Sequence, residues 1–179
     1  MIYLNNYGWN DKLSQLKQES TYNALTHGRI SIVHRTCYEV VSENGLFQCE
    51  LTGNMMYGKS DIELPCTGDW VLFQPFDEHK GIIVDMLPRE RTLYRKKNGT
   101  VADKQAIASY VDKAFIVQSL DDNFNVRRAE RFMVQMQEEN INPVLVFNKA
   151  DLGFDEQKVE EQIRHIARQI PVFFTSIHQ

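Results

Sequence analysis

The chain has 179 residues, of which 42% are hydrophobic, enough for one large or two small domains with a buried core. Its formal net charge of −4 argues against capture of nucleic acid by overall positive charge and leaves only local basic patches for that role. The three cysteines include no CxxC pair, which favours reduced thiols in a cytosolic setting over a disulfide framework or a zinc site.

The N-terminal stretch has neither a basic start nor an apolar segment, and no run in the chain approaches membrane-spanning length. We therefore predict a soluble, cytoplasmic protein without a membrane partner. A short helix is predicted over residues 10–19, with Asn10 or Asp11 as its N-cap and Leu13 and Leu16 on one face. We expect this helix to cover the first domain.

Short β-type runs begin near His27. The predicted strands are Gly28–His34, Cys37–Val41, Leu46–Leu51, Trp70–Gln74 and Gly81–Met86. Asn44 and Gly45 predict a hairpin with a type I′ turn, because both residues tolerate a positive φ. Five short strands punctuated by Gly and Pro indicate an all-β barrel of the OB type, with a small barrel of another topology as the main alternative. OB barrels often bind RNA, but that is an analogy between folds.

The run from Gly53 to Ser60 matches the phosphate-binding pattern G-x-x-x-x-G-K-[ST]. Such a loop works only when a helix starts at its Lys-Ser end, so that helix amides face the phosphates. Only a few residues separate Ser60 from Pro65, too few for a helix. We interpret the match as coincidental; a P-loop ATPase that uses Lys59 is the least favoured alternative.

A basic segment follows the barrel. Between Arg89 and Lys104 the sequence has six basic residues against two acidic ones, with Tyr94 among them. Clustered cations with an aromatic neighbour are typical of surfaces that grip an RNA backbone. The candidate RNA-binding residues are Arg91, Arg95, Lys96 and Lys97. The alternative is a solvated interdomain linker.

From Tyr110 onward the pattern is α/β. Strands are predicted over Val111–Val117, Pro143–Phe147 and Val172–Thr175, and helices over Val126–Glu139 and up to Pro171. The apolar faces are Ala129, Phe132, Met133 and Met136 on the first helix, and Val159, Ile163, Ile166 and Ile170 on the second. The order strand-helix-strand-helix-strand indicates a fragment of a doubly wound parallel sheet.

The second of these strands ends in Asn148-Lys149-Ala150-Asp151, which resembles the base-reading motif of guanine-nucleotide-binding proteins. A carboxylate at Asp151 could accept hydrogen bonds from both N1–H and the N2 amine of guanine, which adenine does not offer. Lys149 could lay its aliphatic stem over the base or ribose, and Asn148 could hold the loop through backbone hydrogen bonds. The alternative is an ordinary polar turn that caps the next helix.

Several further stretches strengthen the resemblance. They are Gly68-Asp69-Trp70-Val71, Arg91-Thr92-Leu93-Tyr94-Arg95, residues 110–119, residues 124–132 and Asn148-Lys149-Ala150-Asp151-Leu152. Together they resemble the RsgA/YjeQ family of ribosome small-subunit-dependent GTPases. The resemblance implies a circularly permuted GTPase, in which the base-reading loop precedes the phosphate-binding loop, flanked by an N-terminal OB domain and a C-terminal zinc domain.

The resemblance also implies partners and site residues. The ligand would be GTP, and the partners would be the small ribosomal subunit and its rRNA, late in maturation of that subunit. Asn148, Lys149 and Asp151 would read guanine, and Ser176 lies where the family has a second base-contacting loop.

No phosphate-binding loop, Mg²⁺-holding Ser/Thr, switch region or zinc cluster follows in this sequence up to Gln179. We therefore predict no catalytic residue here, expect Mg²⁺ and Zn²⁺ only in parts outside this chain, and expect the chain alone not to hydrolyse GTP. An RNA- or ribosome-binding module without hydrolysis is the alternative, and a fragment or a degenerate gene product fits equally. The predicted organisation is an N-terminal extension (1–25), an OB-fold barrel (26–88), a basic linker (89–109) and a truncated permuted GTPase domain (110–179).

Overall fold

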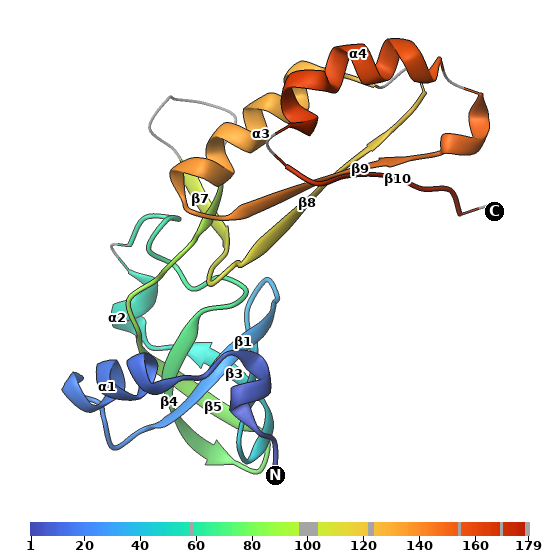
Figure 1. The fold of residues 1–179 in the computed structure, drawn as a ribbon. Helices are drawn as coiled ribbons and strands as arrows, with labels where there is room; N and C mark the ends of the chain where they lie inside the picture. Colours follow the sequence, from blue (N-terminus) through green and yellow to red (C-terminus); the bar gives the residue numbers. More distant parts are fainter. Residues whose placement is uncertain (58, 97–103, 122–123, 154, 169, 178–179) are drawn as a thin grey trace. The chain divides into compact units, whose positions relative to one another are not determined.

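A computed structural model of the chain describes residues 1–57, 59–96, 104–121, 124–153, 155–168 and 170–177, with the backbone alone described at residues 96, 156, 166 and 167. The chain divides into two compact units, Met1–Tyr110 and Val111–Gln179 (Figure 1). Among the described helices, none is both long enough and apolar enough to cross a membrane.

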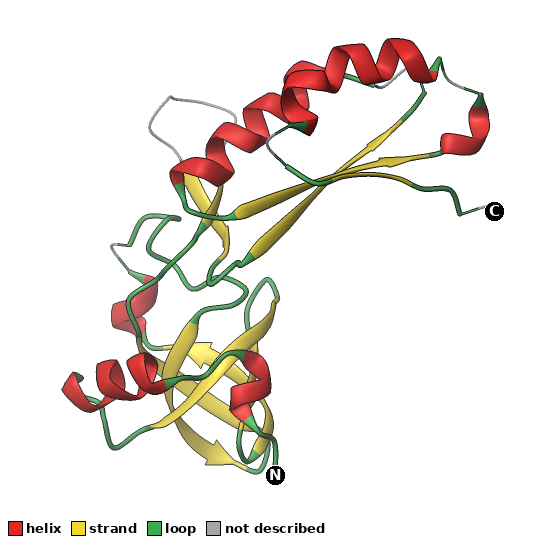
Figure 2. Cartoon of the chain, viewed as in Figure 1, coloured by secondary structure: helices red, strands yellow, loops and turns green. Residues whose placement is uncertain are grey.

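The first unit is built on a closed five-stranded barrel (Figure 2). Its strands are β1 (Thr26–Val33), β2 (Tyr38–Ser42), β3 (Gly45–Leu51), β4 (Trp70–Asp77) and β5 (Lys80–Met86). They follow the order β1-β2-β3-β5-β4, and β4 closes on β1; the β3–β5 pair is parallel and the others are antiparallel. This order is that of the OB fold, so the predicted fold class is confirmed.

The barrel interior is filled by side chains that alternate along the strands. On β3, for example, Phe47 and Cys49 point inward while their neighbours are more exposed. The predicted hairpin is present, because Ser42 pairs with Gly45 across a two-residue loop. The predicted type I′ turn is wrong: Gly45 has a φ of 125°, but Asn44 is not among the residues with positive φ. In this hairpin the positive φ is therefore adopted by Gly45 and not by Asn44.

Helix α1 (Asp11–Glu19) packs on the outside of the barrel, as predicted. The Asn10 side chain accepts a hydrogen bond from the Leu13 backbone N–H at 3.1 Å, so Asn10 is the N-cap. Leu13 is 2% exposed and joins Trp70 and Leu72 in a second apolar cluster beneath the helix. A short 3₁₀ helix, η1 (Leu4–Tyr7), adds Leu4 to the same cluster.

The turn into β4 depends on Gly68 and Asp69. Gly68 has a φ of 94°, and a Cβ there would lie 2.3 Å from the Ser109 carbonyl oxygen, so only glycine fits. The Asp69 carboxylate is fully buried and forms an ion pair with Arg89 at 2.6 Å. The Arg89 guanidinium also donates to the carbonyl oxygens of Ile62 and Leu64. This ion pair ties the loop before β4 to the segment after β5.

The segment predicted as a basic linker contains regular structure. Strands β6 (Leu93–Lys96) and β7 (Lys104–Ala108) pair antiparallel, and both fall in the first unit. The backbone N–H of Ser109 donates to the Thr67 carbonyl at 2.9 Å, which joins this two-stranded sheet to the barrel loop. Part of the basic segment is therefore anchored to the barrel unit.

The second unit is a three-stranded parallel sheet, as the sequence pattern predicted, and its strands lie in the order β10-β9-β8. Its elements are β8 (Lys113–Ser119), α3 (Val126–Glu138), β9 (Asn142–Asn148), η2 (Ala150–Leu152), α4 (Glu156–Ala167) and β10 (Val172–Phe174). Both helices lie on the same face of the sheet (Figure 1), because two right-handed crossovers in the same direction place their helices on one side.

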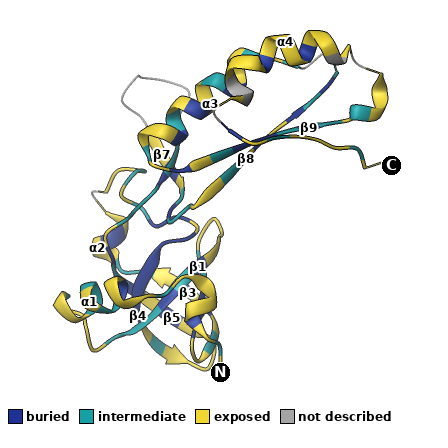
Figure 3. Ribbon diagram, in the orientation of Figure 1, coloured by how far each residue is buried: buried dark blue, intermediate teal, exposed yellow. Residues whose placement is uncertain are grey.

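The two faces of this sheet differ in burial (Figure 3). The helix-covered face forms a core of Ile116, Leu120, Ala129, Met133, Leu145, Phe147, Val159, Ile163 and Ile170. On the other face Phe115, Val117 and Phe173 are 66%, 60% and 54% exposed. The sequence analysis placed Phe132 in the core, but it is 44% exposed, because the buried stripe of α3 runs along Ala129, Met133 and Met136.

Helix α4 ends earlier than predicted. We expected Ile170 to continue the apolar stripe up to Pro171, yet the helix stops at Ala167. Ile170 nevertheless packs in the core with 9% exposure. The pattern located the buried residue correctly but not the end of the helix, because burial in a following loop gives the same apolar signal.

Candidate functional site

The carboxyl ends of the three parallel strands meet at one edge of the sheet, where ligands bind in folds of this class. Ser119 at the end of β8 lies opposite Asn148 at the end of β9. Backbone hydrogen bonds continue past the strands: Leu120 N–H donates to Asn148 O at 2.9 Å, and Ala150 N–H to Thr175 O at 3.1 Å. Three loops are thus held together at this edge.

Asn148 fixes the loop that follows β9. Its side-chain oxygen accepts from the Lys149 backbone N–H at 2.8 Å and from the Thr175 hydroxyl at 3.3 Å. The bond to Thr175 crosses from β9 to β10. Lys149 adopts the left-handed conformation, with φ 63°, which is uncommon for a side chain of this size. Backbone strain of this kind often marks a functional loop.

Asp151 lies in η2, directly after Lys149 and Ala150, and is exposed. The Ser176 hydroxyl, from the loop after β10, donates to the Asp151 carboxylate at 2.5 Å. Sequence analysis named both residues for one site, and the structure brings them together although 25 residues separate them. A carboxylate in this position has acceptor capacity for further donors.

Lys149 makes a contact that the sequence analysis missed. Its ammonium donates to the Asp121 carboxylate at 2.7 Å, and the two side chains are 48% and 22% exposed. Asp121 follows the end of β8, and Asn148 is the last residue of β9, so both residues lie at the same edge of the sheet. An acidic residue two positions after a parallel strand was the sequence signal that would have found it.

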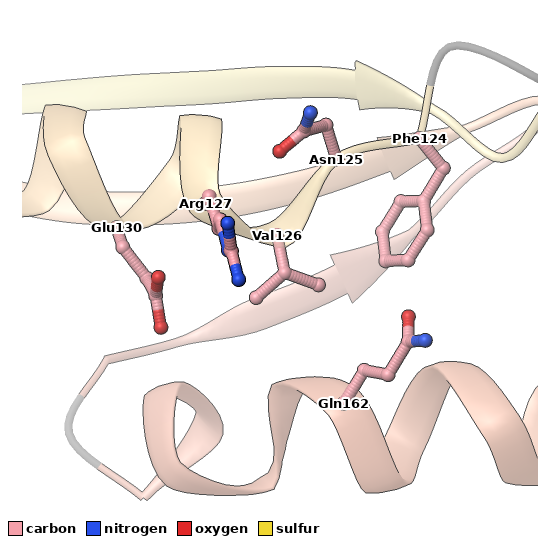
Figure 4. Close-up of a pocket in the computed structure, with 6 residues that line it drawn as sticks. All are labelled: Phe124, Asn125, Val126, Arg127, Glu130 and Gln162. Carbon is pink, nitrogen blue, oxygen red and sulfur yellow. The ribbon is translucent and has the colours of Figure 1, made fainter.

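A cavity of about 510 Å³ lies beside this edge, between α3 and α4 (Figure 4). Its lining residues are Phe124, Asn125, Val126, Arg127, Glu130 and Gln162. None of Asn148, Lys149, Asp151 or Ser176 lines it. We place the candidate site at the strand ends, because the convergent polar groups lie there, whereas the cavity lies between the two helices.

The loop around Lys59 lacks the geometry of a phosphate-binding loop. A helix, α2 (Gly53–Met56), precedes Lys59, and a turn over Asp61–Leu64 follows it. The Ser60 hydroxyl and backbone N–H both donate to the Glu63 carboxylate, at 2.6 and 2.9 Å. These two bonds, that of the hydroxyl foremost, lower the pKa of Glu63. A carboxylate thus occupies the donors that a phosphate would need.

The predicted RNA-binding residues differ in their surroundings. Arg91 is half-buried, has a φ of 45° and donates to the Glu90 carboxylate at 3.3 Å. Arg95 is exposed on β6. Lys96 ends the same strand and only its backbone is described, and Lys97 lies outside the described residues. Within the described part of the chain no group of three His, Cys, Asp or Glu residues could hold a metal ion.

Comparison with curated proteins finds relatives that share one name and description. The chain is 72% identical over 173 residues to the small ribosomal subunit biogenesis GTPase RsgA 1 of Bacteroides thetaiotaomicron, covering 97% of this chain and 49% of that protein. It is 30% identical over 179 residues to the RsgA protein of Opitutus terrae, covering 94% of this chain and 49% of that protein. The chain therefore spans about half the length of these curated relatives.

Two solved structures share the fold. The structure of YloQ, described as a circularly permuted GTPase, matches with a TM-score of 0.58 at 22% identity. The match covers 90% of this chain and 55% of the YloQ chain. The structure of YjeQ from Thermotoga maritima matches with a TM-score of 0.61 at 24% identity. The match covers 84% of this chain and 51% of the YjeQ chain. The sequence model of the RsgA GTPase family matches residues 86–179, more than half of the chain. The chain therefore belongs to the RsgA GTPase family.

Proposed function

We propose that this chain carries the guanine-reading loop of a GTP-binding factor that acts in maturation of the small ribosomal subunit in the cytoplasm. The observation that carries the proposal is the meeting of Asn148, Lys149, Asp151 and Ser176 at the carboxyl edge of the sheet. The Asp151 carboxylate would accept from N1–H and the N2 amine of guanine, with the Ser176 hydroxyl holding it in place.

The other two residues would support this recognition. Asn148 holds the loop by accepting hydrogen bonds from the Lys149 N–H and the Thr175 hydroxyl. The aliphatic stem of Lys149 would cover one face of the base. A preorganised loop of this kind loses little conformational entropy on binding.

The test is base selectivity in Asp151→Asn. Xanthine carries a carbonyl where guanine carries the N2 amine, so an amide side chain pairs with xanthine and a carboxylate pairs with guanine. We expect the wild-type chain to bind GDP over XDP, and the variant to lose that preference by about 100-fold or more, because each charge-assisted hydrogen bond contributes about 1.5–3 kcal/mol.

Asp155→Asn is the matched control. Its carboxylate accepts from the Lys158 backbone N–H at 3.1 Å near the start of α4, a role that an asparagine also fills. Its GDP affinity should equal that of the wild type. Equal GDP/XDP selectivity in wild type and Asp151→Asn would refute the role of Asp151.

We further propose that these 179 residues bind GTP without hydrolysing it. Phosphoryl transfer needs groups positioned around the triphosphate and Mg²⁺. In the barrel unit, the Glu63 carboxylate occupies the Ser60 donors of the loop around Lys59. None of the described loops after the parallel strands has the glycine-rich phosphate-binding pattern. Measurable GTP turnover by the purified chain, abolished by Asp151→Asn, would overturn this.

The second candidate function is RNA or ribosome binding without hydrolysis, favoured by the OB topology of the barrel and the exposed Arg95 on β6. If Arg95 neutralises one rRNA phosphate, Arg95→Gln should reduce the slope of log affinity against log salt by about 0.7–0.9. Binding of small subunits with that slope unchanged in the variant would exclude Arg95 from the interface. Binding of small subunits but no guanine nucleotide would favour this second function over the first.

A further inference from the structure

We propose that Asp121 is a positioning residue of the candidate guanine site, which acts by fixing the side chain of Lys149. The inference rests on the proposed function and assigns a role to a residue outside the Asn-Lys-x-Asp motif. Its basis is the 2.7 Å contact between the Lys149 ammonium and the Asp121 carboxylate.

The position of Asp121 is fixed on both sides by the fold. Before it, Leu120 is 5% exposed, and its N–H donates to the Asn148 carbonyl at 2.9 Å. After it, the Phe124 N–H donates to the Asp121 carbonyl at 2.8 Å, and the Phe124 ring packs edge-on against Phe147 at 5.4 Å. Asp121 is therefore held between two residues, Leu120 and Phe124, that each contact β9.

Lys149 is constrained in a complementary way. Its backbone is held in the left-handed region, with its N–H bound to the Asn148 side chain. The residue has a long side chain, which samples many rotamers when it has no partner and loses entropy when it is immobilised. The pair with Asp121 fixes the far end of that side chain before any ligand arrives. A stem already ordered at the strand ends offers its apolar surface to a base at lower entropic cost.

The pair links the ends of two neighbouring strands. Asp121 comes from the β8 end and Lys149 from the β9 end, while the Asn148–Thr175 and Asp151–Ser176 bonds link the β9 and β10 ends. The site thus has side-chain links on both sides of β9. The carboxylate also supplies a local negative charge that holds the ammonium on the β8 side.

A double-mutant cycle tests the proposal. The 179-residue wild type, Asp121→Asn, Lys149→Met and the double variant are titrated with fluorescent N-methylanthraniloyl-GDP. We expect Asp121→Asn to weaken binding by about 3- to 5-fold, the range for a partly exposed ion pair. In the Lys149→Met background the same substitution should have almost no effect, because its target is gone.

Two further measurements separate positioning from a merely structural role. Raising salt from about 0.05 to about 1 M should reduce the Asp121→Asn effect, since the screening length then falls to about 3 Å, close to the 2.7 Å separation of the pair. Asp121→Glu should restore much of the affinity. Asp112→Asn, at the opposite end of β8, is the control and should bind as the wild type does.

The outcomes are distinguishable. Guanine-selective binding with an equal loss for Asp121→Asn in both backgrounds would overturn the positioning role and leave the proposed function standing. No GDP binding by the wild type would defeat the proposed function, and the positioning role with it. Coupling between Asp121 and Lys149, with guanine selectivity that depends on Asp151, supports both.

Discussion

Arg89→Met should strongly destabilise the barrel unit while leaving its surface almost unchanged. Arg89 sits in a segment that reads as basic and linker-like, yet its side chain is only 14% exposed and its guanidinium pairs with the fully buried Asp69. Methionine keeps the length and apolar stem of the side chain. The substitution therefore removes the charge and the hydrogen bonds with little change in packing volume.

The magnitude follows from what remains around Asp69. Without Arg89 its carboxylate keeps only donors from Cys66, the backbone N–H at 2.7 Å and the weakly donating thiol. Removal of one partner from a buried ion pair costs about 3–5 kcal/mol. The carbonyls of Ile62 and Leu64 also lose a donor, but both residues are partly exposed, so water can replace it. We expect a loss of about 3 kcal/mol in the free energy of unfolding.

Tryptophan fluorescence during urea unfolding is the suitable assay, because Trp9 and Trp70 both belong to the first unit. Adding Asp69→Asn to Arg89→Met should recover part of the loss, since no buried charge then lacks its partner. Arg95→Met, an exposed arginine from the same basic segment, should change stability by less than about 0.5 kcal/mol. A loss below about 1 kcal/mol for Arg89→Met would refute the reasoning.

Three more predictions concern the same unit. Gly68→Ala should cost at least about 2 kcal/mol by urea unfolding, because its Cβ would meet the Ser109 carbonyl at a positive φ. Burial, and after it the neighbouring lysine, lowers the pKa of His27, so the free energy of unfolding should be constant above the unfolded pKa of about 6.5 and should decrease as the pH drops toward the folded pKa. His27→Gln should make this decrease smaller, whereas the control His79→Gln, at an exposed histidine, should leave it unchanged. Iodoacetamide at pH 8 should label Cys37 first in peptide mass spectra, since burial raises the pKa of the other two thiols to about 12; equal labelling of all three would contradict this.

The histidine prediction has a geometric basis. The Lys17 ammonium lies 3.2 Å from Nδ1 of His27, and an ammonium can only donate, so Nδ1 must be the acceptor of a neutral ring. Trp9 stacks on the same ring with centroids 4.1 Å apart. Protonation would place two cations side by side in a half-buried position, which is why the folded state favours the neutral form. A stability profile that rises as pH falls below about 6.5 would contradict this account.

Periodicity in the sequence predicted the elements well. The short β-type runs located all five barrel strands, and the continuous apolar runs located the strands of the parallel sheet. The burial of both faces that such runs suggest was wrong, because one face of this sheet is exposed. The polar groups after β9 were expected at a sheet edge, and the structure puts them there. The assignment of those groups to guanine stays a prediction.

The predictions from sequence were wrong where the same residue type is compatible with two structural environments. Phe132 fitted an apolar helix face but lies outside the buried stripe, and Ile170 fitted a helix but lies in the loop after it. Asn44 was compatible with a type I′ turn, but Gly45 takes the positive φ. Propensity states what a residue tolerates, and packing selects among the tolerated conformations.

By itself, then, the sequence determined where most strands and helices form and most of the buried side chains, because those signals repeat within a few neighbouring residues. Only the tertiary structure decided which charges meet. Arg89 finds Asp69 at a separation of 20 residues, and Lys149 finds Asp121 at 28. Such pairs have no local pattern, since they depend on how distant segments come together when the barrel closes and the parallel strands align their ends.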